Sequence, residues 1–348
     1  MKILYAIQGT GNGHLSRARD IIPLLEKKGH VDVLVSGTEA EVSLDFPIKY
    51  RLQGLGFVFG KKGGIDLKKT FLKTNIYRFL KEIYSLPVEN YDLVINDFEP
   101  VSAWASKLKK KLCIGLSHQS AVLSGNAPQP KSEDALGKFI VKHYAPASIH
   151  YGFHFSSFEP TVFTPLIRKQ IREAIVSDQG HYTVYLPAYA DELIYNVLSG
   201  FKKVDWQVFS KHNKKAFQLG NVCISPLDNE AFIESMASCK GMLCGAGFET
   251  PAEALFLGKK VMVIPMKNQF EQQCNAAALK SMGVPVIKRL HKKHGETLYQ
   301  WIEQGEVIKV NYPDITESII NHIIHTHAPA NNPVKDYSWD RNYQINPI

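Results

Sequence analysis

The sequence is poor in cysteine and lacks any long apolar run. Its five cysteines form no C-x-x-C pair, and Cys113 lies inside an apolar segment. This pattern predicts reduced, buried thiols rather than a disulfide framework. No stretch approaches the roughly 18 apolar residues of a membrane-spanning helix. The N-terminus has one lysine and a few apolar residues before Gly9, too short a run for a signal peptide. We therefore expect a cytoplasmic protein. Peripheral contact with the inner face of a membrane is compatible with these features.

Charged residues are also modest in number, at 21% of 348 residues against 45% apolar ones. These proportions exclude a disordered chain, a collagen and a disulfide-stapled miniprotein. The signs are unbalanced, because 41 Lys and Arg face 33 Asp and Glu, a formal surplus of +8. Such a surplus suits nucleic acid, an anionic membrane or a phosphate-bearing ligand, and composition does not choose among them.

Short apolar runs alternate with amphipathic stretches along the whole chain. Continuous Val, Ile and Leu runs are typical of parallel strands that are covered on both faces. The repetition predicts an α/β protein with two Rossmann-like, doubly wound parallel-sheet domains. The expected strands are Ile3–Ile7, Val31–Val35, Leu93–Ile95, Leu112–Leu116, Val184–Leu186, Trp206–Phe209, Met242–Cys244 and Val261–Ile264. The expected helices include Ser16–Lys28, Glu230–Ser238 and Glu271–Met282.

Prolines and a serine pair interrupt this pattern between residues 156 and 182. We therefore expect an N-terminal domain over 1–160 and a C-terminal domain over 161–325. The remainder, 326–348, contains Pro329, Pro333 and Trp339 and predicts a tail that packs on the domains.

A glycine loop follows the first expected strand. Gly9, Gly11 and Gly13 precede His14 and a helix, and such a loop forms an anion site because free backbone N–H groups converge there. The spacing departs from the dinucleotide fingerprint, whose third glycine is replaced by His14. The second strand also ends in Ser36 rather than in an acidic residue, so NAD binding is not expected.

His14 is a candidate general base, because the start of a helix favours neutral imidazole. Asp97 ends another expected strand and would orient the imidazole at the same sheet edge. Two alternatives stay open. Both side chains could merely cap helices, or Asp97 and Glu99 could hold a divalent cation against a nucleotide diphosphate.

A second glycine turn lies in the C-terminal half, from Cys244 to Leu255. Thr250, Pro251 and Glu253 also fit a helix capping box with proline at the first helical position. About twenty residues later, another strand leads into a polar segment over 268–276. Two such loops beside one helix N-terminus suit a nucleotide diphosphate that carries a sugar.

With these motifs the chain resembles the GT-B nucleotide-sugar glycosyltransferases, especially the MurG-like and UDP-glucuronosyltransferase-like branch. The resemblance implies two domains facing a cleft, and an inverting, metal-independent hexosyl transfer from a UDP-sugar to an acceptor hydroxyl. It implies that His14 is the base and Asp97 its partner. Glu253 would hold the ribose, while Glu271 and Gln272 would contact the transferred sugar. The implied donor-binding set is Gly11, Asn12, Gly13, Ser225, Gly245, Ala246, Gly247, Phe248, Thr250, Glu253, Glu271, Gln272 and Asn275.

The sequence departs from that family at three places. Gly245 stands where many relatives have histidine, Glu271 where aspartate is usual, and Leu227 near a position often filled by glutamine. The expected base-reading loop is Ile224–Pro226. We expect no cofactor and no metal, since the helix N-terminus can absorb the charge of the leaving group.

A basic stretch over 49–81 contains nine Lys and Arg against one acid, Asp66, with aromatic residues interleaved. It predicts either contact with an anionic membrane or lipid-phosphate acceptor, or a solvated loop. Nucleic-acid binding is the non-enzymatic alternative, although it leaves both glycine turns unexplained. A nucleotide-sugar 2-epimerase is the enzymatic alternative. Histidines at 322, 325 and 327, and at 291 and 294, are weak candidates for a metal site.

Overall fold

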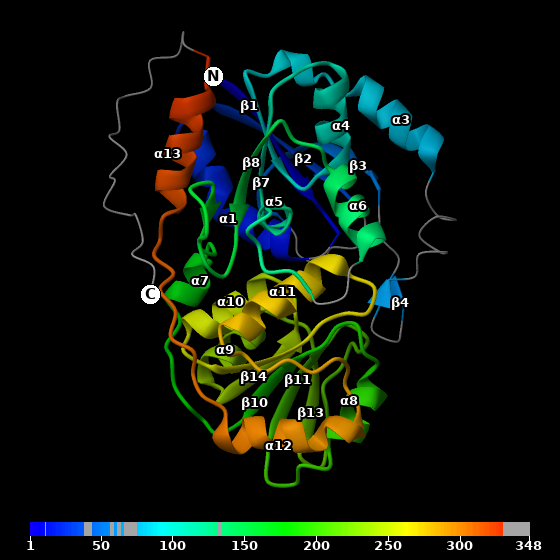
Figure 1. The fold of residues 1–348 in the computed structure, drawn as a ribbon, viewed down its shortest axis with the longest axis vertical. Coiled ribbons are helices and arrows are strands. Elements are labelled where there is room, and N and C mark those ends of the chain that lie inside the picture. The colour runs from blue at the N-terminus through cyan, green and yellow to red at the C-terminus, as the bar shows by residue number, and fades with distance from the viewer. Residues whose placement is uncertain are drawn as a thin grey trace.

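The computed structural model describes residues 1–10, 12–37, 44–55, 59–60, 64–65, 75–130 and 134–329. Figure 1 shows two α/β halves stacked along the long axis, each with a sheet flanked by helices. The predicted fold class is therefore confirmed, with two parallel sheets in one chain.

The N-terminal sheet has seven strands in the order β3-β2-β1-β6-β7-β8-β9, and the neighbours pair in parallel. Its central strands are buried along their length, as their continuous apolar runs predict. The strands are β1 (Lys2–Gln8), β2 (His30–Ser36), β3 (Ile48–Leu52), β6 (Leu93–Asp97), β7 (Cys113–Ser117), β8 (Ile149–Phe153) and β9 (Val162–Phe163). A separate two-stranded ribbon consists of β4 (Phe59–Gly60) and β5 (Gly64–Ile65).

The C-terminal sheet has six strands in the order β12-β13-β11-β10-β14-β15. Only the edge strand β12 pairs antiparallel among the strands described for this sheet. The strands are β10 (Tyr182–Tyr185), β11 (Trp206–Ser210), β12 (Phe217–Leu219), β13 (Val222–Pro226), β14 (Gly241–Gly245) and β15 (Lys260–Ile264). Residues 224–226, expected in a loop, are thus the end of strand β13.

Helices connect the strands and cover both faces of the sheets (Figure 1). The first half contains α1 (Asn12–Glu26), α3 (Ile76–Ser85), α4 (Pro100–Leu108), α5 (His118–Val122) and α6 (Ala135–Tyr144). The second contains α7 (Lys169–Arg172), α8 (Asp191–Leu198), α9 (Asn229–Ser238), α10 (Glu249–Phe256), α11 (Phe270–Ser281) and α12 (Gly295–Gln304). The last helix is α13 (Thr316–His327).

Each sheet reverses its strand order beside one central strand. In the first sheet β1 lies between β2 and β6, and in the second β10 lies between β11 and β14. In open α/β sheets, ligands bind outside the carboxyl ends of the strands at such a switch point. The loop after β1, the end of β6 and the loop after β14 all leave these edges, and α10 and α11 lie next to α1 and α5 between the sheets (Figure 1).

The passage between the two halves differs from the expected boundaries at 160/161 and 325/326. Strand β9 still pairs with β8, so the first sheet extends to Phe163. Helix α13 returns to the first half and packs against α1. Its isoleucines share one apolar core with Ile21 and Ile22 of α1, so α13 covers the apolar face of α1. Most of the expected tail, from residue 330 on, lies outside the described residues.

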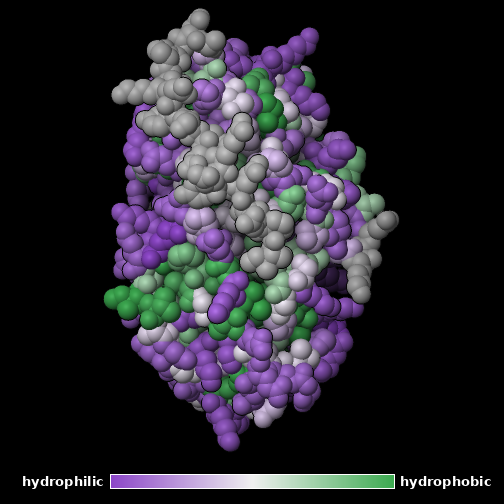
Figure 2. Space-filling model, turned by 60° about the vertical axis from the view of Figure 1, so that its left-hand side comes forward, coloured by the Kyte–Doolittle hydropathy of each residue, from purple (hydrophilic) through white to green (hydrophobic). Residues whose placement is uncertain are grey.

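The surface is mainly hydrophilic on the face drawn in Figure 2, with apolar residues gathered in one area just below its middle. Elsewhere, several large apolar side chains of α3 and α6 are exposed, among them Tyr77 at 80% and Phe139 at 60%. Among the described residues, no helix has both the length and the apolar character needed to cross a membrane.

Candidate active site

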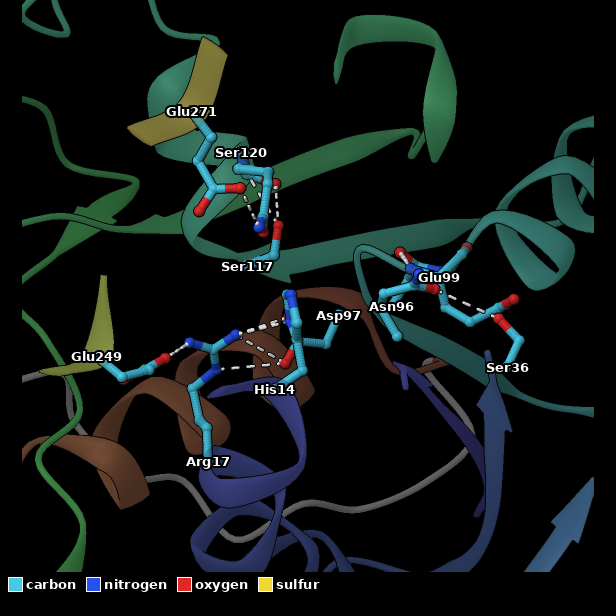
Figure 3. Close-up of polar contacts among 12 residues, drawn as sticks. His14, Arg17, Ser36, Asn96, Asp97, Glu99, Ser117, Ser120, Glu249 and Glu271 are labelled. Carbon is cyan, nitrogen blue, oxygen red and sulfur yellow. Dashed lines mark hydrogen bonds and ion pairs between the residues drawn. The ribbon is translucent and has the colours of Figure 1, made fainter. Parts of the chain in front are cut away.

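His14 and Asp97 meet at the carboxyl edge of the first sheet. His14 lies in the first turn of α1, directly after β1, and Asp97 is the last residue of the neighbouring strand β6. His14 Nδ1 lies 2.8 Å from Asp97 Oδ1 (Figure 3). The expected contact between these side chains is therefore present, while their catalytic role stays a prediction.

Arg17 completes this cluster from one turn further along α1 (Figure 3). Its Nη2 donates to both Asp97 carboxylate oxygens at 2.8 Å and lies 3.2 Å from His14 Nδ1. Both Arg17 and Asp97 are buried. Burial alone would raise the pKa of Asp97, but Arg17 and His14 outweigh it and hold that pKa below its usual value.

An ionised Asp97 accepts a hydrogen bond and donates none, so the imidazole proton belongs on His14 Nδ1. Nε2 then carries the free lone pair, and His14 lines a cavity between the two halves. That tautomer is the one that a general base requires.

The N-terminus of α10 lies across from this cluster. Glu249, its first residue, accepts from Arg17 Nη1, so an ion pair joins the two halves. A Cβ on Gly13 would lie 2.9 Å from Glu249 Cγ, and glycine permits this close approach. Burial raises the pKa of Glu249 to about 7, with Arg17 opposing the rise and Glu253 and Asp97 adding to it.

The capping box expected at Thr250 and Glu253 is wrong. Helix α10 begins at Glu249 with Phe248 as its N-cap residue, and no side chain caps it. Pro251 is therefore the third helical residue rather than the first. The free N–H groups of this first turn, which includes Thr250, remain able to bind an anion.

The other glycine-turn residues follow β14 toward α10. Gly245 ends β14, and no heavy atom lies within 4 Å of the position that a Cβ on Gly247 would take. Ser225 lies in β13, half-buried, at the carboxyl end of the same sheet. The turn therefore has open space beside it, as an incoming phosphate requires.

The start of α11 faces the His14 cluster from the C-terminal half. Gln119 Nε2 of α5 donates to Glu271 Oε2 at 2.9 Å, and burial raises the pKa of Glu271. Gln272 Oε1 accepts from the backbone N–H of Met266 at 2.9 Å. Glu271 and His14 line one cavity of about 120 Å³, together with the aromatic rings of Phe98, Tyr144 and Phe270.

Three predicted donor residues have buried side chains at the junction of the halves. Phe248 stacks on His118, with ring centroids 3.9 Å apart. Asn275 Oδ1 lies 2.6 Å from His118 Nε2, and its Nδ2 donates to the carbonyl of Ala246 at 3.0 Å. Burial lowers the pKa of His118 to about 4. Phe248 and Asn275 thus contact the opposite half, and Ala246 anchors Asn275.

Glu253 is also buried and already paired. Arg168, in the segment between the sheets, donates from Nε to Oε1 at 2.5 Å and from Nη2 to Oε2 at 2.9 Å. A ribose would therefore have to share this carboxylate with Arg168. Of the remaining predicted donor residues, Gly11 and the side chain of Asn12 lie outside the described residues.

The cation-binding interpretation of Asp97 and Glu99 is wrong. Glu99 is fully buried and caps α4, since its carboxylate accepts from the N–H groups of Val101 and Ser102 at 2.8 and 2.6 Å. It thus lies apart from Asp97 (Figure 3). Within the described ranges, no group of three or more His, Cys, Asp or Glu side chains could hold a metal, and this includes the histidines near 291 and 322.

Sequence reasoning missed Arg17, Glu249, Gln119, His118 and Arg168. Arg17 had a signal, because it lies three residues after His14 and therefore on the same helix face. Arg168 and His118 had none, since their partners are distant in the sequence.

The sequence matches the model of glycosyl transferase family 1 over residues 1–303. Among solved structures, Acinetobacter baumannii MurG aligns with a TM-score of 0.57 and 14% identity, covering 93% of this chain and 99% of that one. A UDP-glucosyltransferase from Polygonum tinctorium gives 0.56 and 14%, covering 94% and 93%. Arabidopsis thaliana UGT89C1 complexed with UDP gives 0.55 and 13%, covering 92% and 93%. The comparison with curated protein sequences gave no significant match. The family match, the GT-B architecture and the strand-edge site agree: the chain belongs to glycosyl transferase family 1 and is a glycosyltransferase.

Proposed function

We propose that this glycosyltransferase inverts configuration and needs no metal. It moves a hexosyl group from a nucleotide diphosphate sugar, with UDP as the expected nucleotide, to a hydroxyl of a lipid or other membrane-associated acceptor. The observation that carries the proposal is the His14–Asp97 pair at 2.8 Å, beside a cavity that Glu271 of the other half also lines.

In this proposal His14 Nε2 takes the proton of the acceptor hydroxyl. The hydroxyl oxygen attacks the anomeric carbon while the nucleotide diphosphate leaves from the opposite face, which inverts the configuration. Asp97 stabilises the imidazolium that forms, and Arg17 keeps Asp97 ionised.

The leaving diphosphate would lie on the turn from Gly245 to Gly247 and on the first turn of α10. Free N–H groups and the helix dipole there stabilise the charge that develops as the bond breaks. Glu271 and Gln272 would accept hydrogen bonds from hydroxyls of the sugar. The similarity to a solved UDP complex and to a UDP-glucosyltransferase supports UDP as the nucleotide.

A panel of UDP, GDP and dTDP, each free and with its common sugars, tests the donor by thermal shift. A ligand that binds the native state at a hundred times its Kd adds about 2.7 kcal/mol to the free energy of unfolding. We expect the UDP compounds to raise the midpoint most, in buffer with EDTA. No response to any nucleotide would contradict the proposal, and UDP release without an acceptor would favour the 2-epimerase or hydrolysis.

The surface of α3 supports contact with an anionic membrane. Ile76, Leu80 and Tyr84 recur every four residues and are 57%, 44% and 67% exposed. Lys81 and Arg78 flank this stripe, which gives the helix the amphipathic character of interfacial helices, although Arg78 also pairs with Glu82 at 3.7 Å. Lys49 is paired with Asp32 at 2.6 Å, and most other basic residues of 49–81 lie outside the described ranges.

Liposome co-sedimentation with and without anionic lipid tests this contact. We expect Leu80→Ser combined with Tyr84→Ser to reduce binding to anionic vesicles at least threefold. Ile175→Ser is the matched control, because Ile175 is 89% exposed in the segment that leads into the second sheet. Equal binding of neutral and anionic vesicles would contradict the membrane proposal.

A further inference from the structure

Arg17 is a buried residue of α1, and all three nitrogens of its guanidinium contact carboxylates. Its guanidinium donates to Asp97 with two nitrogens, at 2.8 and 3.3 Å, and its third nitrogen reaches Glu249. Its Cζ also lies 5.3 Å from the centre of the Phe153 ring. The side chain is 2% exposed, so every one of these contacts forms away from water.

These partners come from separate elements of both halves. Asp97 ends β6 of the first sheet, whereas Glu249 begins α10 of the second, at the turn that faces the expected leaving group. The planar guanidinium fixes the angle between its donors, so a contact with Glu249 constrains the contact with Asp97. The position of α10 is thereby connected to the imidazole through two carboxylates and one cation.

We propose that Arg17 is a positioning residue of the transfer reaction, and that Glu249 aligns it from the opposite half. Contact between α10 and α1 then holds the imidazole in the orientation in which Nε2 of His14 can accept a proton. This inference rests on the proposed role of His14 as the base. It concerns how that base is held, and so it can fail while the transferase activity stands.

Two physical consequences follow for His14. Arg17 donates to both oxygens of Asp97, so it weakens the attraction of that carboxylate for an additional proton. Its Nη2, 3.2 Å from Nδ1, also disfavours imidazolium directly. Without Arg17, the buried pair of Asp97 and His14 would retain an additional proton more readily, and a proton on either group leaves Nε2 unable to act as a base.

The first test follows His14 in the full chain by ¹⁵N-histidine NMR, with its signals assigned by their loss in His14→Ala. We compare the wild type with Arg17→Met and Arg17→Lys, and with Arg19→Met as the control. Arg19 lies on the same helix and pairs with Asp45 at 3.9 Å. In Arg17→Met, the change from imidazolium to neutral imidazole should move up by about one pH unit or more. Arg17→Lys should restore at least half of that shift.

The second test measures UDP release from the donor found in the thermal-shift panel, with a lipid extract as the source of acceptor. We expect Arg17→Met to lower kcat about 10²-fold, with donor KM within about twofold, and the acidic limb of its pH–rate profile to move to higher pH. Glu249→Leu should lower kcat less. The double variant should be no worse than Arg17→Met, because both changes act through one contact.

Unchanged titration of His14 in Arg17→Met, or additive effects in the double variant, would overturn the proposal. Should Arg17→Met fail to fold, Arg17→Lys and Glu249→Leu carry the same two measurements. Turnover that survives His14→Ala would refute the proposed base instead, and the NMR titration would still report on positioning by Arg17.

Discussion

Glu253 is a buried carboxylate whose two oxygens already have a partner within the protein. Its two oxygens are taken by the Nε and Nη2 of Arg168, whose Nη1 donates to Asn229 at 3.1 Å. The family resemblance assigns the same carboxylate to a ribose. A ribose hydroxyl can still donate to lone pairs that the guanidinium leaves free, because each carboxylate oxygen accepts two hydrogen bonds.

Replacing Glu253 should therefore affect stability and binding together. Glu253→Ala leaves the Arg168 cation buried and unpaired, so we expect it to lower the free energy of unfolding by about 3–5 kcal/mol. We also expect UDP affinity, measured by calorimetry at a temperature where the variant is folded, to fall about tenfold. Glu303→Ala, at an exposed position of α12, is the control. Unchanged UDP affinity would limit Glu253 to its pairing with Arg168.

Residue identity alone predicted part of this site. The contact between His14 and Asp97 was predictable, because the carboxyl ends of adjacent parallel strands converge at one edge. The contacts of Phe248 and Asn275 with His118 were not, since they depend on how the two halves meet. The pairing of Glu253 with Arg168 was not predictable either, because the two residues are 85 positions apart in the sequence.

At the scale of elements, the helix starts at the sheet edges determine which groups face the site. Helix α4 is capped by Glu99, whereas α10 begins with no side-chain cap. The uncapped first turn of α10 keeps its N–H groups available, in agreement with a role in binding phosphate. Glu99, two residues after Asp97, therefore stabilises the start of a helix and is not part of the candidate active site.

The cap of α4 can be tested through stability. Glu99→Ala removes the acceptor of two backbone N–H groups, so we expect the free energy of unfolding to fall by about 1–2 kcal/mol in urea titrations. Glu99→Gln should lose less, because its amide oxygen still accepts. Asp228→Ala, at the cap of α9, provides a comparison. Unchanged stability of Glu99→Ala would contradict the capping role of Glu99.

Most central strands were predictable, and the missed ones share a reason. The expected apolar runs became β1, β2, β6, β7, β10, β11, β14 and β15. Strand β3 alternates half-buried and exposed residues at a sheet edge, β8 contains His150 and Gly152, and β13 ends in Ser225 and Pro226. Such strands lack a continuous apolar run, so hydrophobic pattern alone does not find them.

At the scale of the whole molecule, the two halves meet through charged and polar groups as well as apolar ones. The Glu249–Arg17 pair joins the two halves, and the Glu253–Arg168 pair joins α10 to the segment between the sheets. The charge surplus lies mainly in residues 1–160, with +6 of the total +8. The half with the surplus also carries the α3 surface, which agrees with an anionic partner for the acceptor side.

The pH dependence of stability should reveal Glu249. Its pKa is raised from 4.5 to about 7, chiefly by burial, so the folded state holds a proton that the unfolded state releases. This contribution is full below pH 4.5 and is lost as the pH rises through 7, for a total of about 3 kcal/mol. Glu249→Gln should therefore be more stable than the wild type at pH 8 and lose that advantage near pH 4.5. Parallel stability curves would contradict the assigned environment of Glu249.

We propose above that His14 is the base of a metal-independent transfer. The most direct test measures UDP release from the identified UDP-sugar in EDTA, with a lipid extract as the source of acceptor, for the wild type, His14→Ala and the exposed control His325→Ala. We expect His14→Ala to lower turnover by about 10²–10⁴ while the donor Kd changes less than about twofold, and His325→Ala to behave as the wild type. Near-normal turnover by His14→Ala would contradict it.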